Sequence, residues 1–281
     1  MAHLSGAPST KRARLRLGCM GWQEKDWRGP FYPQDTKAAD MLAAYARLLP
    51  TVEVDSTFYG RPRQATVEGW RDAVTDDFRF ALKVPRMVSH FKRFRDADQI
   101  FAYFVERVRA LGPKLGAILI QCPPDFNATQ AHRERLFTFL ESQLPPDINV
   151  ALELRDEGWY DDALFALARE ERFALAASES EHASVALAKR ILDAQGDALD
   201  FAYVRWMGSA ALERYDRVQV DKSESLDVWA GILQKLRGRV KDVYGYVSDD
   251  YSGHAPAMVR ELMERLGEPA PAPGTEAPRL F

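Results

Sequence analysis

The sequence predicts an α/β fold, a single (β/α)8 barrel of the TIM type. The first observation is that short apolar or β-branched runs alternate with longer segments of helical period from residue 14 to about residue 267. The second is that eight such strand–helix units occupy about 250 residues, the usual size of a closed barrel. Open, doubly wound sheets usually contain fewer strands, so the closed barrel is preferred.

Eight runs are the strand candidates, and several of them are almost continuously hydrophobic. Parallel strands that are buried on both faces have this composition. In chain order the candidates are residues 15–22, 51–57, 78–85, 115–123, 148–155, 173–179, 201–208 and 243–250.

The segments between these runs carry apolar stripes with the spacing of amphipathic helices. The clearest stripe consists of Leu226, Trp229, Leu233 and Leu236, which recur at i, i+3, i+7 and i+10. Two further stripes, within residues 100–111 and 258–266, end beside a glycine that suits a helix C-cap. We therefore expect a barrel domain over residues 14–267, a flexible N-terminal segment over residues 1–13 and a Pro/Ala-rich, disordered tail over residues 268–281.

The composition is that of an ordinary globular protein, with 46% hydrophobic and 28% charged residues. The formal net charge of -3 provides no overall positive field that would attract a polyanion. The two cysteines, Cys19 and Cys122, lie in apolar runs, which excludes a disulfide framework. No segment approaches the ~20 apolar residues of a membrane helix, and the N-terminus lacks the apolar region of a signal peptide. We expect a cytoplasmic protein with no membrane partner.

Polar side chains recur at the C-terminal ends of the predicted strands, where the active sites of TIM barrels lie. Alternation along each strand decides which of them point into the barrel. In the run TVEVDST, Val52 and Val54 are expected to face the helices, which turns Glu53 and Asp55 inward. The same reasoning and the strand ends give an inward set of Glu53, Asp55, Lys83, Gln121, Glu153, Arg155 and Arg205.

Two interpretations of this set are open, because a charge inside a barrel is costly unless it is paired. One is a structural ion network that fills the barrel. The other, which we favour because apolar residues would fill the space without the cost of desolvation, is a functional polar pocket. In a water-accessible pocket, the substitution Glu153→Gln is expected to leave stability unchanged or higher, because it relieves crowding among carboxylates.

The residue types in this pocket predict acid/base chemistry. Two carboxylates in different surroundings can act as general acid and general base, and Glu53 and Glu153 are the predicted pair. Lys83 is a third candidate acid or base, an amine nucleophile or a plain ion-pair partner. Arg155 and Arg205 are predicted to bind a substrate anion or a developing oxyanion.

Long loops after the first, third and seventh strands carry the aromatic residues Trp22, Trp27, Tyr32, His90 and Tyr215. These side chains either stack on a substrate ring or only cap the barrel. The basic run at residues 92–95 either follows a phosphate backbone or is a solvated loop.

The sequence favours neither a metal nor a cofactor. No HExxH motif, no Cys/His cluster with ligand spacing and no glycine-rich nucleotide motif occurs. Only His90 and His254 are expected in loops after strands. His132 and His182 are expected in helical stretches that face away from the mouth of the barrel.

Seven ordered segments make the chain resemble the YecE-like family, also called domain of unknown function 72. They are GCMGWQEKDWRGPFYP, VEVDSTFYGRP, FRFALKVPRMVSH, ILIQCPPDF, ALELRDEGW, YVRWMG and VYGYVSDDYSGHA. The resemblance covers about residues 15–266 and implies a TIM barrel, but no particular activity. The strand-end residues that match family motifs are Trp22, Glu53, Tyr59, Lys83, His90, Gln121, Glu153, Arg155, Trp159 and Arg205.

Some of these positions complete the predicted substrate-binding set. Beside the two arginines it contains Trp22, Asp55, Tyr59, His90 and Gln121. The chain departs from the family pattern at Met207, where a histidine is usual, and at Asp55, where an asparagine is usual.

These observations favour an enzyme that acts by acid/base catalysis on a small polar or anionic substrate, such as a sugar phosphate. They do not choose among hydrolase, isomerase and lyase. One alternative is a phosphodiester-processing or single-stranded nucleic-acid-binding protein, although the net charge makes nucleic acid an unlikely partner. Another is a barrel that binds a ligand without catalysis. The sequence predicts no oligomeric state.

Overall fold

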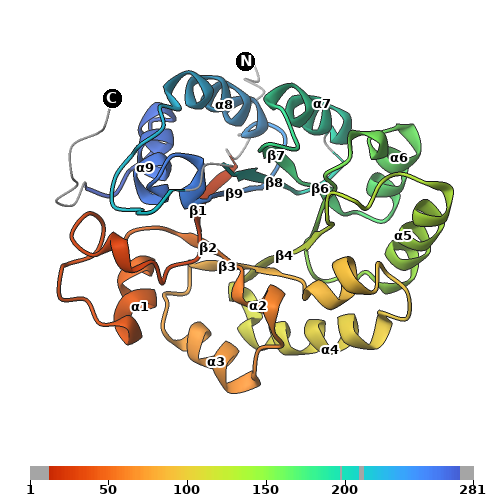
Figure 1. Ribbon diagram of the computed structural model, residues 1–281, viewed down its shortest axis with the longest axis horizontal. Helices are drawn as coiled ribbons and strands as arrows, with labels where there is room; N and C mark the ends of the chain where they lie inside the picture. Colours follow the sequence, from red (N-terminus) through yellow and green to blue (C-terminus); the bar gives the residue numbers. More distant parts are fainter. Residues whose placement is uncertain (1–12, 197, 209–211, 273–281) are drawn as a thin grey trace, which may run out of the picture.

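In the computed structural model, which describes residues 13–196, 198–208 and 212–272, the chain forms a barrel of parallel strands (Figure 1). The strand order in the sheet is β6-β5-β4-β3-β2-β1-β9-β8-β7. The strands are β1 (Arg14–Met20), β2 (Thr51–Val54), β3 (Arg79–Lys83), β4 (Leu115–Gln121), β5 (Val150–Glu153), β6 (Ala174–Leu175), β7 (Ala177–Glu179), β8 (Phe201–Trp206) and β9 (Asp242–Val247).

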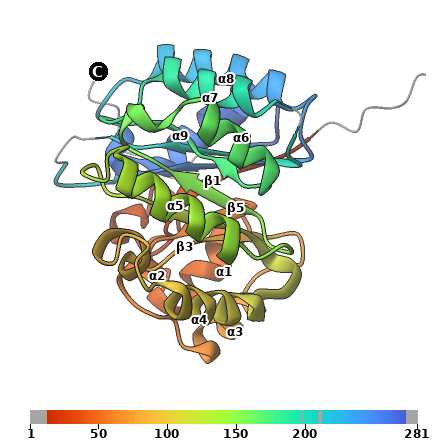
Figure 2. The same cartoon turned by 90° about the vertical axis from the view of Figure 1, so that its right-hand side faces the viewer.

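Helices surround the barrel, and the side view in Figure 2 shows α5 lying outside β5. They are α1 (Met41–Ala46), α2 (Ser56–Tyr59), α3 (Gln64–Asp72), α4 (Asp98–Val108), α5 (Gln130–Gln143), α6 (Asp162–Glu170), α7 (Val185–Gln195), α8 (Ser223–Leu236) and α9 (Ala255–Arg265). The predicted stripe of α8 is confirmed, because Leu226, Trp229, Leu233 and Leu236 are all buried.

All eight predicted strands are present, and the sixth is split in two. The predicted run 173–179 forms β6 and β7, which Ala176 separates. β6 pairs with β5, whereas β7 pairs with β8. This single run of chain therefore joins the two ends of the sheet, and the predicted TIM-like barrel is confirmed.

A side chain completes the barrel where β6 lacks a neighbour. The backbone N–H of Leu175 donates to Gln195 Oε1 at 2.8 Å, and Gln195 Nε2 donates to the Leu175 carbonyl at 3.0 Å. Gln195 is the last residue of α7 and is buried. Its amide takes the place of a β8 residue in the ladder, so both buried backbone groups of Leu175 are satisfied.

Alternation along the strands divides the core into two layers, as predicted. Val52, Val54, Leu152 and Leu154 belong to the large apolar cluster that includes the helices. A second cluster fills the inside of the barrel with small residues and rings: Ala81, Ala117, Leu119, Ala151, Ala174, Ala176, Leu199, Phe201, Tyr203, Tyr244 and Tyr246. The polar strand-end residues therefore rest on an apolar plug.

Three remaining expectations concern the tails, the cysteines and membranes. Apart from Ala13 and residues 268–272, the predicted flexible N-terminal segment and disordered tail lie outside the described residues. Cys19 and Cys122 are buried free thiols. Among the helices of the described residues, none combines the length and the apolar character needed to cross a bilayer.

We expect the substitution Gln195→Leu to lower the free energy of unfolding by about 2–4 kcal/mol, because it leaves two buried backbone groups of Leu175 without partners. Urea unfolding measures this loss. Gln99→Leu, at an exposed position of α4, is the control and should change stability by less than about 0.5 kcal/mol. Equal effects of the two substitutions would contradict the role assigned to Gln195.

Candidate functional site at the mouth of the barrel

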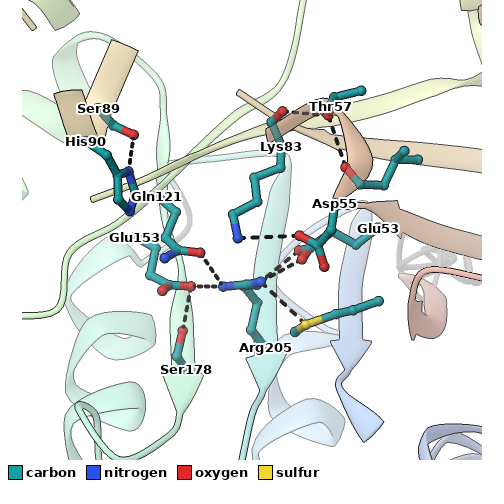
Figure 3. Close-up of polar contacts among 12 residues, drawn as sticks. Glu53, Asp55, Thr57, Lys83, Ser89, His90, Gln121, Glu153, Ser178 and Arg205 are labelled. Atoms are coloured by element: carbon teal, nitrogen blue, oxygen red, sulfur yellow. Dashed lines mark hydrogen bonds and ion pairs between the residues drawn. The ribbon is translucent and has the colours of Figure 1, made fainter. Parts of the chain in front are cut away.

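Arg205, on β8, lies at the centre of the barrel mouth and uses all five of its N–H donors (Figure 3). Its Nε and Nη2 donate to the two carboxylate oxygens of Glu53 at 3.0 and 2.7 Å. Its Nη1 donates to Glu153 and, at 3.4 Å, to Gln121 Oε1. The remaining contact, at 3.4 Å, joins Nη2 to Met20 Sδ. The guanidinium therefore bridges the two carboxylates predicted as acid and base.

This cluster is almost fully removed from solvent. The side chains of Glu53, Arg205 and Glu153 are 0%, 2% and 3% exposed. Glu53 also accepts a hydrogen bond from Tyr203 at 2.7 Å, and Glu153 accepts one from Arg155 Nε at 3.1 Å. The premise that Glu153 stands in a water-accessible pocket is wrong, because Arg205 and the neighbouring strands enclose it.

The surroundings of the two carboxylates shift their pKa values in opposite directions. Burial raises the pKa of Glu53 above its usual range, against the opposing charge of Arg205. Burial also opposes ionisation of Glu153, but Arg205 and Arg155 together outweigh it and lower the pKa of Glu153 to about 2. Glu153 is therefore the fixed anion of the cluster, and Glu53 is the carboxylate that accepts a proton more readily.

A polar cavity of about 220 Å³ lies above the cluster. It is lined by Met20, Asp55, Lys83, Gln121, Arg155, Ser180, Glu181, His182, Arg205, Met207, Gly208, Ser248 and Asp250. Five of the predicted site residues thus meet at one cavity, while Glu53 and Glu153 lie beneath it. Its volume suits a small polar molecule.

Lys83 reaches into the mouth from the end of β3. Its Nζ lies 3.4 Å from Asp55 Oδ1 and 4.4 Å from the centre of the Phe58 ring. Only 11% of the side chain is exposed. Burial, and next the charge of Arg205, lower the pKa of Lys83. The Thr57 hydroxyl fixes the neighbouring strand ends, because it donates to the Lys83 carbonyl at 2.6 Å.

Two further donors face the cavity. Arg155 uses its Nε on Glu153, and no hydrogen bond from its two terminal nitrogens is found among the described residues. Gln121 accepts from Arg205 through Oε1, which leaves its amide NH2 as a donor. Arg205, in contrast, was predicted to bind substrate, but its donors are already engaged within the protein.

Three predicted substrate-binding residues lie away from this cavity. Trp22 is buried and packs edge-on against Trp70 with 5.7 Å between ring centres. Tyr59 is 69% exposed at the end of α2. His90 is half-buried against the Phe58 ring, and burial followed by the charge of Lys83 lowers its pKa to about 4.

The other aromatic residues of the loops have structural contacts. Trp27 and Tyr32 are buried and pack against one another. Trp159, which the resemblance placed at a strand end, is fully buried, and its Nε1 donates to the Phe126 carbonyl at 2.7 Å. The burial of Trp27 and Tyr32 agrees with the interpretation that these two rings only cap the barrel.

The prediction that His182 lies in a helix facing away from the mouth is wrong. The side chain of Ser184 accepts a hydrogen bond from the Leu187 N–H, so α7 starts only at Val185. His182 therefore stays in the loop after β7, where it lines the cavity beside Glu181, with 3.3 Å between the Nε2 and Oε1 atoms. Serine before an apolar helical stripe was the signal for this boundary.

The loop after β9 supplies two more cavity residues, Ser248 and Asp250, which the predicted site set does not contain. Asp250 accepts from the Tyr215 hydroxyl at 2.7 Å and lines the cavity. Its neighbour Asp249 turns away and accepts from Trp27 Nε1 at 3.0 Å. Across residues 13–196, 198–208 and 212–272, no three His, Cys, Asp or Glu side chains are grouped to hold a metal ion.

Comparison with known proteins identifies the family. The sequence profile described as "Protein of unknown function DUF72" matches residues 16–280. The chain belongs to the DUF72 family. It is 24% identical over 277 residues to the UPF0759 protein YunF of Bacillus subtilis, with 90% of this chain and 94% of YunF covered. It is 36% identical over 114 residues to the UPF0759 protein YecE of Escherichia coli, and this match covers 41% of each chain.

Solved structures of DUF72 proteins share the fold. The protein from Thermotoga maritima has a TM-score of 0.74 at 22% identity, with 90% of this chain and 99% of that chain covered. The protein from Enterococcus faecalis has a TM-score of 0.69 at 20% identity, with 92% and 100% covered. Met207, where the family pattern usually has a histidine, adds an apolar wall to the cavity here.

We expect Glu153→Gln to lower the free energy of unfolding by about 3–5 kcal/mol, because it leaves the buried Arg205 with only one carboxylate. Asp55→Asn is the control. The Asp55 side chain is 36% exposed, so its loss should cost less than about 1 kcal/mol. Urea unfolding at neutral pH measures both, and a small loss in both variants would contradict a stabilising ion network.

The two buried carboxylates should give opposite pH dependences. A Glu153 pKa of about 2 lies below the value near 4.3 in the unfolded chain, so its contribution is present above about pH 5 and is lost as the pH falls towards 2. The pKa of Glu53 is raised, so its contribution is present at low pH and is lost as the pH rises above about 4.3.

Urea unfolding between pH 3 and pH 6 tests this prediction. The stability difference between wild type and Glu153→Gln should grow with pH, and the difference between wild type and Glu53→Gln should shrink. If both stability differences changed with pH in the same direction, the two carboxylates would titrate alike and the prediction would be wrong.

Proposed function

We propose that the protein is an enzyme that binds a small anionic, polyhydroxylated substrate in the mouth cavity and moves a proton with Lys83. The observation that carries this proposal is the state of the Lys83 amine. It is largely buried, its pKa is lowered, and it faces the cavity beside Asp55. Desolvation that lowers the pKa of a lysine favours its neutral amine, which is the form that a general base requires.

The other cavity residues suit the recognition of such a substrate. The terminal nitrogens of Arg155 and the amide of Gln121 can donate to a phosphate or carboxylate. Asp55 and Asp250 can accept from substrate hydroxyls. Recognition of both an anion and hydroxyl groups favours a compound such as a sugar phosphate.

Glu53 and Glu153 act in this proposal through Arg205 rather than on the substrate. They hold the guanidinium under the cavity, where its charge helps to lower the pKa of Lys83. In the proposed step, a proton moves from a carbon next to the substrate carbonyl to Lys83 Nζ. The negative charge that develops on the carbonyl oxygen is stabilised by Arg155.

The substitution Lys83→Arg tests the role of the amine, because arginine is also a long basic side chain but stays protonated and therefore cannot accept the substrate proton. We expect wild-type protein in D2O to exchange the carbon-bound proton next to the carbonyl of at least one aldose or ketose phosphate of three to six carbons, as seen by NMR. Lys83→Arg should slow this exchange at least about 100-fold, with substrate affinity changed less than about threefold.

Lys222→Arg is a matched control. The Lys222 Nζ also lies 4.4 Å from an aromatic ring, that of Tyr251, and 3.8 Å from a Glu179 oxygen, but it does not line the cavity. Its substitution should leave exchange unchanged. Undiminished exchange in Lys83→Arg, or no exchange with any sugar phosphate that binds, would overturn the proposal.

A further inference from the structure

Most of the large apolar side chains that are exposed among the described residues lie in the segments that follow β2 and β3. Those found among the described residues are Tyr59 at 69%, Met87 at 39%, Phe91 at 62% and Val228 at 53% exposure. Val228 stands apart on α8, whereas the other three follow β2 and β3 directly. Grouped aromatic side chains at the surface of a soluble protein mark a contact site.

Arg86 links the two exposed rings. Its guanidinium carbon lies 5.5 Å from the centre of the Tyr59 ring and 5.1 Å from that of Phe91. Cation–π contacts at these distances hold the rings at the surface while Arg86 itself stays exposed. Two aromatic rings with a guanidinium between them form a platform on which planar groups can stack.

A basic hollow of about 480 Å³ begins at Phe91. Its lining is Phe91, Lys92, Arg93, Arg95, Asp96, His132 and Arg135. Phe94 anchors this loop, because its ring is buried against Phe126 and Phe139 at 5.5 and 5.1 Å between ring centres. This contact holds the loop in place, and the cations on both sides of Phe94 line the hollow.

The local charge is opposite to that of the whole protein. Residues 59–63 and 84–97 contain Arg61, Arg63, Arg86, Lys92, Arg93 and Arg95, with Asp96 as their single acid. Asp125 pairs with Arg93 from the neighbouring loop. In a chain with a net charge of -3, this concentration of cations beside exposed rings provides charge complementarity for a polyanion that also carries planar groups.

We propose that this surface, Tyr59, Arg86 and Phe91 together with the basic hollow, binds single-stranded nucleic acid. Unpaired bases would stack on the two rings, and successive phosphates would lie in the hollow. Bases of a duplex have their faces covered by their neighbours and cannot use the rings. The surface shares no lining residue with the mouth cavity, so this binding does not depend on the proposed enzyme activity.

Fluorescence anisotropy with a labelled 12-nucleotide oligo(dT), an oligo(U) of the same length and a mixed-sequence duplex tests this proposal. At 50 mM salt we expect both single strands to bind more tightly than the duplex. Their affinity should fall steeply between 50 and 200 mM salt, because phosphate contacts release counterions.

Variants separate stacking from simple charge attraction. Tyr59→Ala and Phe91→Ala should each raise the Kd for oligo(dT) about fivefold or more. Lys92→Gln and Arg95→Gln should weaken binding. Each should also reduce the steepness of a plot of log affinity against log salt concentration by about one. Val228→Ala and Lys235→Gln, exposed positions on α8, are the matched controls and should leave the Kd unchanged.

Three outcomes would overturn the proposal. They are the absence of oligonucleotide binding at 50 mM salt, equal affinity for the single strands and the duplex, and unchanged affinity in Tyr59→Ala and Phe91→Ala. Thermal melting of each variant confirms that it is folded. Both alanine substitutions remove exposed rings, so we expect all variants to melt close to wild type.

Discussion

The charge of one buried arginine is the constraint on which the barrel mouth depends. A guanidinium that is 2% exposed needs partners for five donors and at least one compensating anion. Glu53 from β2 and Glu153 from β5 supply the anions, and Gln121 from β4 adds an amide oxygen. Four strands, counting β8, are thereby tied together at one height of the barrel. The register Gln121↔Glu153 places these two partners side by side.

This network divides the barrel interior into two environments. Beneath it, Tyr203 and Tyr246 belong to the apolar plug, and the Tyr203 hydroxyl donates a hydrogen bond to Glu53. Above it, Lys83, Asp55 and Arg155 face the cavity and retain part of their contact with solvent. The structural network and the polar pocket, which the sequence presented as alternatives, are therefore consecutive layers of one site.

The positions of the strands, and which of their side chains face the barrel interior, could be predicted from the sequence because successive side chains of a buried strand alternate between its two faces. The inward direction of Glu53, Glu153 and Arg205 follows from it. The hydrogen-bond partners of Arg205 could not be predicted. Alternation shows which side chains point into the barrel, but it does not give the register between strands, which decides which side chains lie at the same level. Alternation also ends with the strand. Gly21 adopts a φ of 89°, and Trp22 packs against Trp70 rather than lining the cavity.

Loop residues were the least predictable part of the site for a related reason. The first residue of a helix depends on a single capping side chain. Because Ser184 caps α7, His182 lies before the helix and lines the cavity instead of belonging to the expected helix. Tyr59 illustrates the opposite case. The chain enters α2 at Ser56, so Tyr59 ends exposed on the outer surface although its motif lies next to an inward carboxylate.

The split sixth strand gives the barrel a seam. Elsewhere in the ring, neighbouring strands hold one another through backbone groups that any sequence provides. At Leu175 the connection runs instead through the amide of Gln195, and therefore through the packing of α7. Local opening of the barrel should start at this point, where the departure of a single helix frees a strand edge, and the amide hydrogen of Leu175 should exchange at the rate at which α7 detaches.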